Sequence, residues 1–337
     1  MIAARSNPVF ADSLNGSLSH FYRRTLAATS EIFPFSLFEA LIISIPLLVA
    51  LVIILAVRAF RRGRAVRFLV NLASFALLVY SAFAISMGVA YNATPLQKKM
   101  GMEEAEINAE VLAEIMTSLR DEANSLVPYV NYVDGASVSG YTDRELSEVI
   151  LRSYDKNAEL LGIKSFPSTA KQIHFGNVMS YFGITGIYTF YTGEANVNSA
   201  YPDFDIAFTS AHELAHQRGI LRENEANFTA YLVCSTSDDP YLRYSAALYM
   251  YQYIGSALYR TDKELYSAIN SGLSEACRGD IRASYEVSRK YGDTVIADIS
   301  NFFNDLYLKG NGTEGVVSYG RVVEMTVSYF EYLKNRK

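Results

Sequence analysis

Two histidines four residues apart, His212 and His216, with Glu213 directly after the first, form the pattern in this chain that most clearly suggests chemistry. Residues i and i+4 of a helix lie on one face, so both imidazoles can bind the same metal ion. Glu213 lies about 100° around the helix from His212, where its carboxylate can take a proton from a water molecule beside the metal. Two of the four histidines in the chain belong to this motif. The motif therefore predicts a metal site with a general base.

A catalytic zinc ion usually has three protein ligands and one open position, so a third ligand is needed. Gly219 predicts the end of the helix, because glycine readily adopts the left-handed conformation just past a helix C-terminus. A second helix is expected to begin near Glu223 and Glu225, which lie about 200° apart on a helix. Only one of these two carboxylates can face the metal.

Glu223 is the predicted third ligand, and Glu225 is the alternative. The face of Glu223 continues through small or polar residues that allow one helix to approach another closely, namely Ala226, Asn227, Ala230 and Cys234. The face of Glu225 continues through residues typical of ordinary packing, namely Phe228, Thr229 and Leu232. Asn227, one turn after Glu223, is expected to form a hydrogen bond with a ligand histidine.

These motifs resemble those of known zinc peptidases. Glu223-x-x-Ala226-Asn227 is similar to the ExxA(D/N) element that supplies the glutamate ligand in gluzincin-type metallopeptidases. A longer set of segments resembles an uncharacterised family of bacterial membrane-anchored HExxH proteins. This set comprises Gly186-Ile187-Tyr188, residues 193–198, AHELAHQRG, ENEANF, residues 34–37 and Ser318-Tyr319-Gly320.

The resemblance implies one Zn²⁺ ion per chain and a zincin-like domain, but it identifies no substrate. Members of that family often begin with a further apolar segment, which this sequence lacks, and an upstream membrane helix is therefore an open question. In zincin-type enzymes the sheet edge beside the active helix commonly lines the substrate cleft, so a strand before the helix is expected either to bind an extended peptide or simply to cover the helix. A tyrosine such as Tyr244 or Tyr249 could stabilise an oxyanion.

Two apolar segments precede this domain. Residues 40–57 are 18 residues without a charge, and the 23 residues from Phe68 to Ala90 contain only Asn71 as a strongly polar residue. At about 1.5 Å per residue, each can cross roughly 30 Å of hydrocarbon. We therefore expect transmembrane helices at 40–57 and 68–91, and the lipid bilayer as a partner.

The loop between the two spans, residues 58–67, contains five arginines. Short basic loops stay in the cytoplasm, so residues 1–39 and 92–337 are expected to be extracytoplasmic. Residues 1–91 carry a net charge of +5, and the total of −5 leaves −10 for the remainder. An acidic domain gives no reason to expect a nucleic-acid partner.

The expected fold is mainly α: two N-terminal transmembrane helices and then a zincin-like α+β ectodomain with a small sheet or hairpin before the active-site helix. We predict a helix that starts at Thr142, with Glu145 as its capping partner. We also predict a β-hairpin within 186–198, in which Glu194 lies at the turn or contacts substrate. Cys234 and Cys277 could form a disulfide or remain buried thiols. Other helices are expected near 102–126, 205–218, 223–234, 241–259, 261–276, 279–291, 293–308 and 316–334.

The leading functional hypothesis is a membrane-anchored zinc metallopeptidase that hydrolyses a peptide or protein substrate. His212, His216 and Glu223 would hold zinc, and Glu213 would act as general base. The alternative is a non-catalytic membrane-anchored receptor or scaffold with a structural or vestigial metal site, which a fourth protein ligand would indicate. A soluble protein with a coincidental motif would require both apolar segments to be buried core. The sequence gives no oligomeric state.

Overall fold

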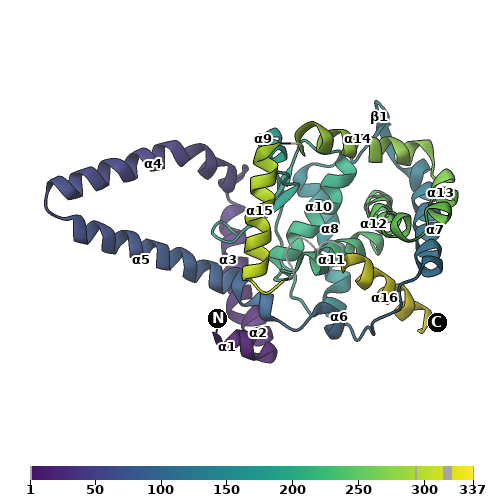
Figure 1. Ribbon diagram of the computed structural model, residues 1–337, viewed down its shortest axis with the longest axis horizontal. Helices are drawn as coiled ribbons and strands as arrows, with labels where there is room; N and C mark the ends of the chain where they lie inside the picture. Colours follow the sequence, from purple (N-terminus) through teal and green to yellow (C-terminus); the bar gives the residue numbers. More distant parts are fainter. Residues whose placement is uncertain (1, 293, 314–320, 337) are drawn as a thin grey trace.

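The computed structural model describes residues 2–292, 294–313 and 321–336. The protein is mainly helical with two small sheets, and a pair of long apolar helices protrudes from one side of the body (Figure 1). The prediction of a mainly α fold is therefore confirmed. Ser318-Tyr319-Gly320, which contributed to the family resemblance, lies outside the described residues.

The protruding pair is formed by α4 (Leu37–Arg61) and α5 (Ala65–Phe83), and α5 continues through the π-helical turn η2 (Ala84–Gly88) and the 3-10 turn η3 (Ala90–Asn92). Both helices are long and apolar enough to cross a membrane, and neither buries its apolar stretch in the body. An exposed apolar surface of this size needs an apolar partner. The predicted span 40–57 lies within α4, whereas the predicted span 68–91 covers most of α5 and continues through η2 into η3, where Met87 and Tyr91 are buried. The two helices could anchor the protein in a membrane.

The segment before α4 is helical, which was not predicted from the sequence. Below, α4 and α5 together are called the apolar hairpin. It consists of α1 (Ile2–Ser6), α2 (Pro8–Leu14), η1 (Asn15–Ser19) and α3 (His20–Ser30). Arg23 of α3 is buried, and it donates to the backbone oxygen of Ser86 in η2 (2.8 Å) and to Asn15 Oδ1 (2.8 Å). Asn15 in turn donates to the backbone oxygen of Gly219 (3.1 Å). These contacts tie the base of α5 to the turn that follows the HExxH helix.

A three-stranded sheet lies beside the HExxH helix. Its strands are β3 (Ala170–Ile173), β4 (Gly186–Thr189) and β5 (Glu194–Asn198), in the order β3-β5-β4, with β5 parallel to β3 and antiparallel to β4. The predicted hairpin is therefore confirmed as β4–β5. The sequence missed β3 because Ala-Lys-Gln-Ile shows neither alternation nor β-branched enrichment. It also missed a small hairpin of β1 (Asn131–Val133) and β2 (Ala136–Val138).

The HExxH helix, α10 (Asp203–Gln217), is the central element of the body, and every residue after Asp203 is buried. The helices α11 (Glu223–Ser235) and α12 (Pro240–Thr261) pack against it, as do β4 and β5. The other helices are α6 (Leu96–Lys99), α7 (Ala109–Leu126), η4 (Val127–Tyr129), α8 (Asp143–Leu161), α9 (Gly176–Tyr181), α13 (Lys263–Ser271), α14 (Glu275–Gly292), α15 (Val295–Gly310) and α16 (Val322–Lys334).

Local signals account for most helix boundaries. The predicted capping box of Thr142 and Glu145 is present at the start of α8. The helix predicted from residue 102 begins only at Ala109, because the Asn108 side chain caps it by accepting from the Val111 N–H. Cys234 and Cys277 are both free and buried, so they are buried thiols rather than a disulfide.

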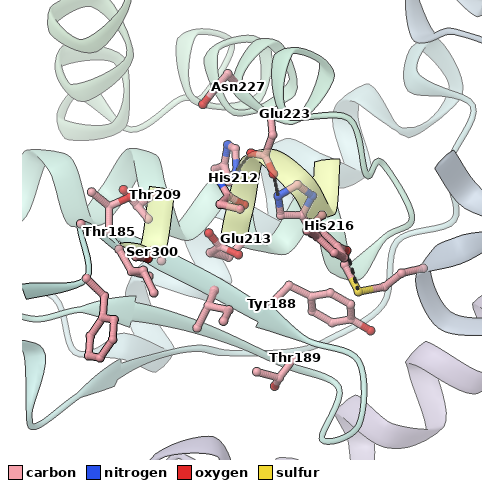
Figure 2. Close-up of a pocket in the computed structure, with 18 of the residues that line it drawn as sticks. Thr185, Tyr188, Thr189, Thr209, His212, Glu213, His216, Glu223, Asn227 and Ser300 are labelled. Carbon is pink, nitrogen blue, oxygen red and sulfur yellow. Dashed lines mark hydrogen bonds and ion pairs between the residues drawn. The ribbon is translucent and has the colours of Figure 1, made fainter. Parts of the chain in front are cut away.

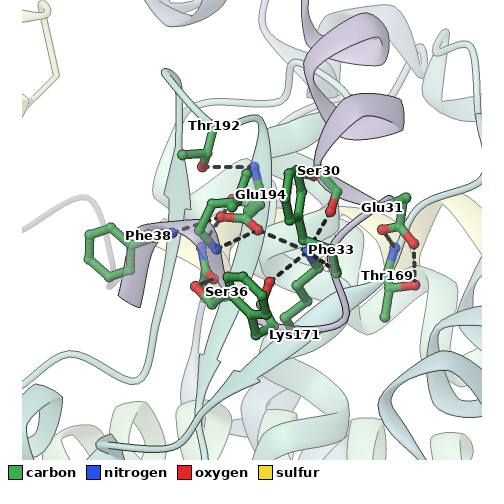
Figure 3. Close-up of polar contacts among 12 residues, drawn as sticks. Ser30, Glu31, Phe33, Ser36, Phe38, Thr169, Lys171, Thr192 and Glu194 are labelled. Carbon is green, nitrogen blue, oxygen red and sulfur yellow. Dashed lines mark hydrogen bonds and ion pairs between the residues drawn. The ribbon is translucent and has the colours of Figure 1, made fainter. Parts of the chain in front are cut away.

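Both predicted roles of Glu194 are wrong, because it is not a turn residue and it does not line the cavity described below, where it could contact substrate. It is buried in β5, where its carboxylate accepts from the backbone N–H groups of Leu37 and Phe38 at the start of α4 (both 2.9 Å) (Figure 3). Lys171 of β3 lies 2.9 Å from the same carboxylate and also donates to the backbone oxygen of Phe33 (3.0 Å). The Lys171–Glu194 pair thus fastens the base of the first apolar helix to the sheet.

We expect Glu194→Ala to lower the free energy of unfolding by about 3–5 kcal/mol, because it leaves the Lys171 ammonium buried without its carboxylate. Thermal unfolding of the purified full chain in detergent measures this. Asp238→Ala is the matched control, since the Lys156–Asp238 pair has a similar separation of 3.2 Å but lies at the surface. Equal destabilisation by the two substitutions would contradict the structural role of Glu194.

Candidate metal centre

The turn between α10 and α11 brings the two halves of the sequence motif together. Gly219 has a φ of +91°, in the left-handed region that favours glycine. A Cβ at this position would collide with the side chains of Arg23 and Asn15. The buried Arg218 supports the turn from the other side by donating to the backbone oxygens of Leu214 (2.9 Å) and Phe166 (2.8 Å). The chain therefore reverses, and α11 packs back along α10.

His212, His216 and Glu223 meet across this helix pair (Figure 2). His212 Nε2 is 3.3 Å from Glu223 Oε2, and His216 Nε2 is 3.7 Å from Glu223 Oε1. One ligand atom from each residue lies within 4.8 Å of the others. Zinc bonds to nitrogen and oxygen are about 2.0–2.2 Å long, which places tetrahedral ligand atoms roughly 3.3–3.5 Å apart. The two separations from Glu223 are close to this spacing, so the three side chains could hold a metal ion.

The orientation of His216 also fits a metal ligand. Its Nδ1 lies 2.8 Å from the backbone oxygen of Ile220, so Nδ1 carries a proton in that contact, and Nε2 is the ring nitrogen that faces Glu223. Within the part of the chain that the structure describes, His212 Nδ1 is buried without a hydrogen-bond partner. The side-chain nitrogen of Asn227 is also buried without one, and Asn227 lines the same cavity. The predicted hydrogen bond from Asn227 to a ligand histidine is thus not among the contacts of the described residues.

The charges of the cluster are strongly coupled. Burial lowers the pKa of His216, but the Glu223 carboxylate outweighs burial and raises this pKa to about 9. Burial raises the pKa of Glu223, but His216 and His212 outweigh it and hold that pKa well below its ordinary value. Without a metal, the cluster therefore contains the ionised carboxylate of Glu223 and an extra proton on the His216 imidazole. A divalent cation would displace this proton on binding.

Glu225, the alternative third ligand, lies elsewhere. Its carboxylate accepts from the Leu96 N–H at the start of α6 (2.9 Å) and forms an ion pair with Arg222 (3.0 Å). The structure therefore brings Glu223, and not Glu225, to the histidines. The two helix faces predict this placement, because only the face of Glu223 continues through residues small enough for α11 to approach α10.

Glu213 points into the same cavity from the next position on α10 (Figure 2). Its carboxylate is buried, accepts a hydrogen bond from the backbone of Tyr188 in β4, and leaves Oε2 without a partner. A Cβ on Gly186 would come within 2.5 Å of Glu213 Oε1, so glycine is required for β4 to lie this close. Burial raises the pKa of Glu213. One oxygen of a buried carboxylate is thus available beside the cluster.

The cavity around the cluster has a volume of about 420 Å³, within the usual range for ligand sites. Besides α10 and α11, the cavity is lined by the edge strand β4 and its flanking residues 182–185 and 190–191, by the end of α5 with η2 and η3, and by α12 and α15. Tyr249, one candidate for oxyanion stabilisation, lines the cavity and stacks on Phe208 with ring centroids 3.9 Å apart. Tyr244, the other, instead donates to Asp280 (2.6 Å) and is not a lining residue.

Several lining residues were missed by the sequence reasoning. They are Phe83, Met87 and Tyr91 at the base of α5, Tyr253 of α12, and Ser300, Asn301, Asn304 and Tyr307 of α15. No local motif marks them, since they reach the cavity through contacts between distant segments. The apolar spacing within residues 295–310 was the one signal that could have marked α15 as amphipathic.

These features define a mainly helical protein with an apolar helical hairpin and a His/His/Glu cluster in a cavity beside the hairpin's base. The chain belongs to a family described as "Protein of unknown function (DUF3810)", whose model matches residues 16–327. No curated protein and no solved structure matches the chain. Family membership supplies no activity, so function is argued from the site.

Proposed function

We propose that this protein is a membrane-anchored zinc metallopeptidase. The observation that carries the proposal is the convergence of His212, His216 and Glu223 within 4.8 Å, with Glu213 buried in the same cavity. Two imidazoles and a carboxylate are typical of catalytic zinc sites that keep one position for water or substrate. The proposal includes one zinc ion per chain and a zincin-like arrangement of sheet edge and active helix.

Each residue of the cluster has a distinct role in this proposal. His212 and His216 would hold zinc through neutral imidazoles, and Glu223 would hold it through its carboxylate. When bound, the metal would supply Lewis acidity, which lowers the pKa of a water molecule and polarises a carbonyl oxygen. Glu213 accepts the proton of the attacking water and returns it to the leaving amine.

The substrate is proposed to be an extended peptide. β4 is an edge strand of its sheet and lines the cavity along its whole length. An extended chain can add to such an edge through backbone hydrogen bonds. Tyr249, which lines the same cavity, is the candidate to stabilise the oxyanion.

The apolar hairpin formed by α4 and α5 sets the proposed membrane topology. Its tip carries Arg58, Arg61, Arg62, Arg64 and Arg67 and lies at the end remote from the body (Figure 1). Basic loops between spans remain in the cytoplasm. Both helices therefore cross the membrane, and the body with its cavity lies on the extracytoplasmic side.

The competing function, a receptor or scaffold with a structural zinc site, would be favoured by a fourth protein ligand. Among the described residues, no fourth His, Cys, Asp or Glu joins the cluster. This observation supports the catalytic proposal over the structural one.

Metal content tests the ligand set. We expect about one zinc per purified full-length chain by elemental analysis, and a large loss of zinc in Glu223→Ala. Glu225→Ala is the matched control, because Glu225 lies on the same helix but contacts Leu96 and Arg222 instead of the histidines. Folded wild-type protein that takes up no zinc even when zinc is added would end the metallopeptidase proposal. Equal zinc loss in both variants would contradict Glu223 as the third ligand.

Peptide hydrolysis tests the general base. We expect Glu213→Gln to keep its zinc but to cleave a quenched-fluorescent peptide library roughly 10²–10⁴-fold more slowly, the usual contribution of a general base. Glu275→Gln, at an exposed position, should cleave at the wild-type rate and controls for the effect of a Glu-to-Gln substitution outside the cavity. Hydrolysis by Glu213→Gln at the wild-type rate would show that this mechanism is wrong.

Reporter fusions test the topology. Alkaline phosphatase, which is active only outside the cytoplasm, should be active in a bacterial host when fused after Lys337. It should be inactive when fused after Gly63 at the hairpin tip. The reverse pattern would place the cavity in the cytoplasm and contradict the proposed orientation.

A further inference from the structure

The helix α15 has an apolar face that the body of the protein leaves uncovered. Five large apolar side chains of this helix are between 46% and 62% exposed: Ile296, Ile299, Phe302, Phe303 and Leu306. Their spacing of three and four residues places them on one side of the helix, which we call the outer face of α15. A contiguous exposed apolar surface of this kind marks an interaction site.

The opposite side of α15 covers the candidate metal centre. Ala297 and Leu308 are buried against the body. The polar residues Ser300, Asn301 and Asn304 line the same cavity as His212 and Glu213. One helix therefore forms a wall of the cavity and presents an apolar surface to the exterior.

The N-terminal end of α15 lies at the base of α4. Thr294, the N-cap of α15, donates to the backbone oxygen of Tyr181 in α9 (3.3 Å). The residue before α9, Phe175, donates its backbone N–H to the carboxylate of Glu39 in the first turn of α4 (2.8 Å). Through α9, the start of α15 is thus connected to the first apolar helix.

The C-terminal end of α15 lies at the base of α5. Tyr307 forms a hydrogen bond with Tyr91 of η3 (3.3 Å). Its ring also packs edge-on against Phe83, the last residue of α5, with centroids 6.1 Å apart. The helix therefore extends from the base of one apolar helix to the base of the other, and in Figure 1 it runs across the hairpin's axis.

This placement identifies what covers the outer face. If the hairpin crosses a bilayer, a helix lying across its base lies parallel to the membrane plane, the orientation in which amphipathic helices bury their apolar face about 5–10 Å into the headgroup boundary. Further exposed apolar side chains occur beside the hairpin's base, just before α4 and on or next to α9. They are Ile32, Phe33, Phe35, Phe175, Val178 and Phe182.

We propose that α15 is an interfacial helix whose outer face is immersed in the surface of the bilayer that the α4–α5 hairpin spans. The cavity wall formed by α15 then lies at the membrane surface. The outer face carries no charged residue, so immersion depends on burying apolar side chains and not on anionic lipids. The inference rests on the membrane anchoring in the proposed function, and it is independent of zinc binding and peptide hydrolysis.

Site-specific fluorescence quenching tests this inference in the full-length protein. Single cysteines replace Phe303 on the outer face, Asp298 outside it on the same helix, or Leu47 in the middle stretch of α4, and each carries an environment-sensitive dye. The native Cys234 and Cys277 are fully buried, so the unsubstituted protein is the labelling control. The protein is reconstituted into phosphatidylcholine vesicles, with or without phosphatidylglycerol, that contain lipid with a nitroxide near the headgroup or at mid-chain.

We expect the headgroup-level nitroxide to quench the dye at Phe303→Cys several-fold more than the dye at Asp298→Cys, equally with and without phosphatidylglycerol. The mid-chain nitroxide should quench the dye at Leu47→Cys. Quenching at Leu47→Cys with none at Phe303→Cys would overturn the interfacial helix and leave the anchor intact. No quenching at either position would overturn both.

A dye at Phe303→Cys that is shielded from aqueous iodide but not quenched by nitroxide lipid would show that protein covers the outer face, such as a second copy of this chain. That result would also overturn the inference. Quenching that appears only with phosphatidylglycerol would contradict the apolar basis of the interaction.

Discussion

The left-handed turn at Gly219 is the constraint on which the candidate metal centre depends. It reverses the chain directly after the second histidine, and the first residue of the following helix, Glu223, then lies opposite both imidazoles. Arg23 and Asn15 occupy the space that a side chain at this position would need. The N-terminal helices therefore close the back of the turn. A short-range feature of backbone geometry and a long-range packing contact thus fix the same three side chains.

Buried polar contacts also hold the hairpin in a fixed relation to this centre. At the base of α4, Glu194 caps the helix and is paired with Lys171 on the neighbouring strand. At the base of α5, the Arg23 guanidinium donates to the backbone of η2. Removing either charge would leave polar groups unpaired where water does not reach, which is costly. The apolar helices are consequently joined firmly to the body.

Local spacing in the sequence is enough to predict part of the site. His212, Glu213 and His216 share one helix, so helix periodicity places them together. The helix end predicted at Gly219 and the small or polar residues on the face of Glu223 place that carboxylate beside them. The two apolar helices were likewise evident from length and composition. The role of Glu194, the strand β3 and the cavity wall from α15 depend on contacts between segments more than 20 residues apart, and no local pattern encodes those contacts. Tyr307 illustrates this, because it reaches Tyr91 across 216 positions.

If the proposed peptidase activity and membrane anchoring hold, the position of α15 across the base of the α4–α5 hairpin has a consequence for substrate choice. With one end of that helix in contact with α5 and the other connected to α4 through α9, the cavity would sit at a constant height above the lipid. A polypeptide that emerges from the same bilayer would reach the cavity only with residues that lie at this height above the lipid. Such an arrangement would act as a molecular ruler, selecting bonds by their reach from the membrane more than by the side chains around them.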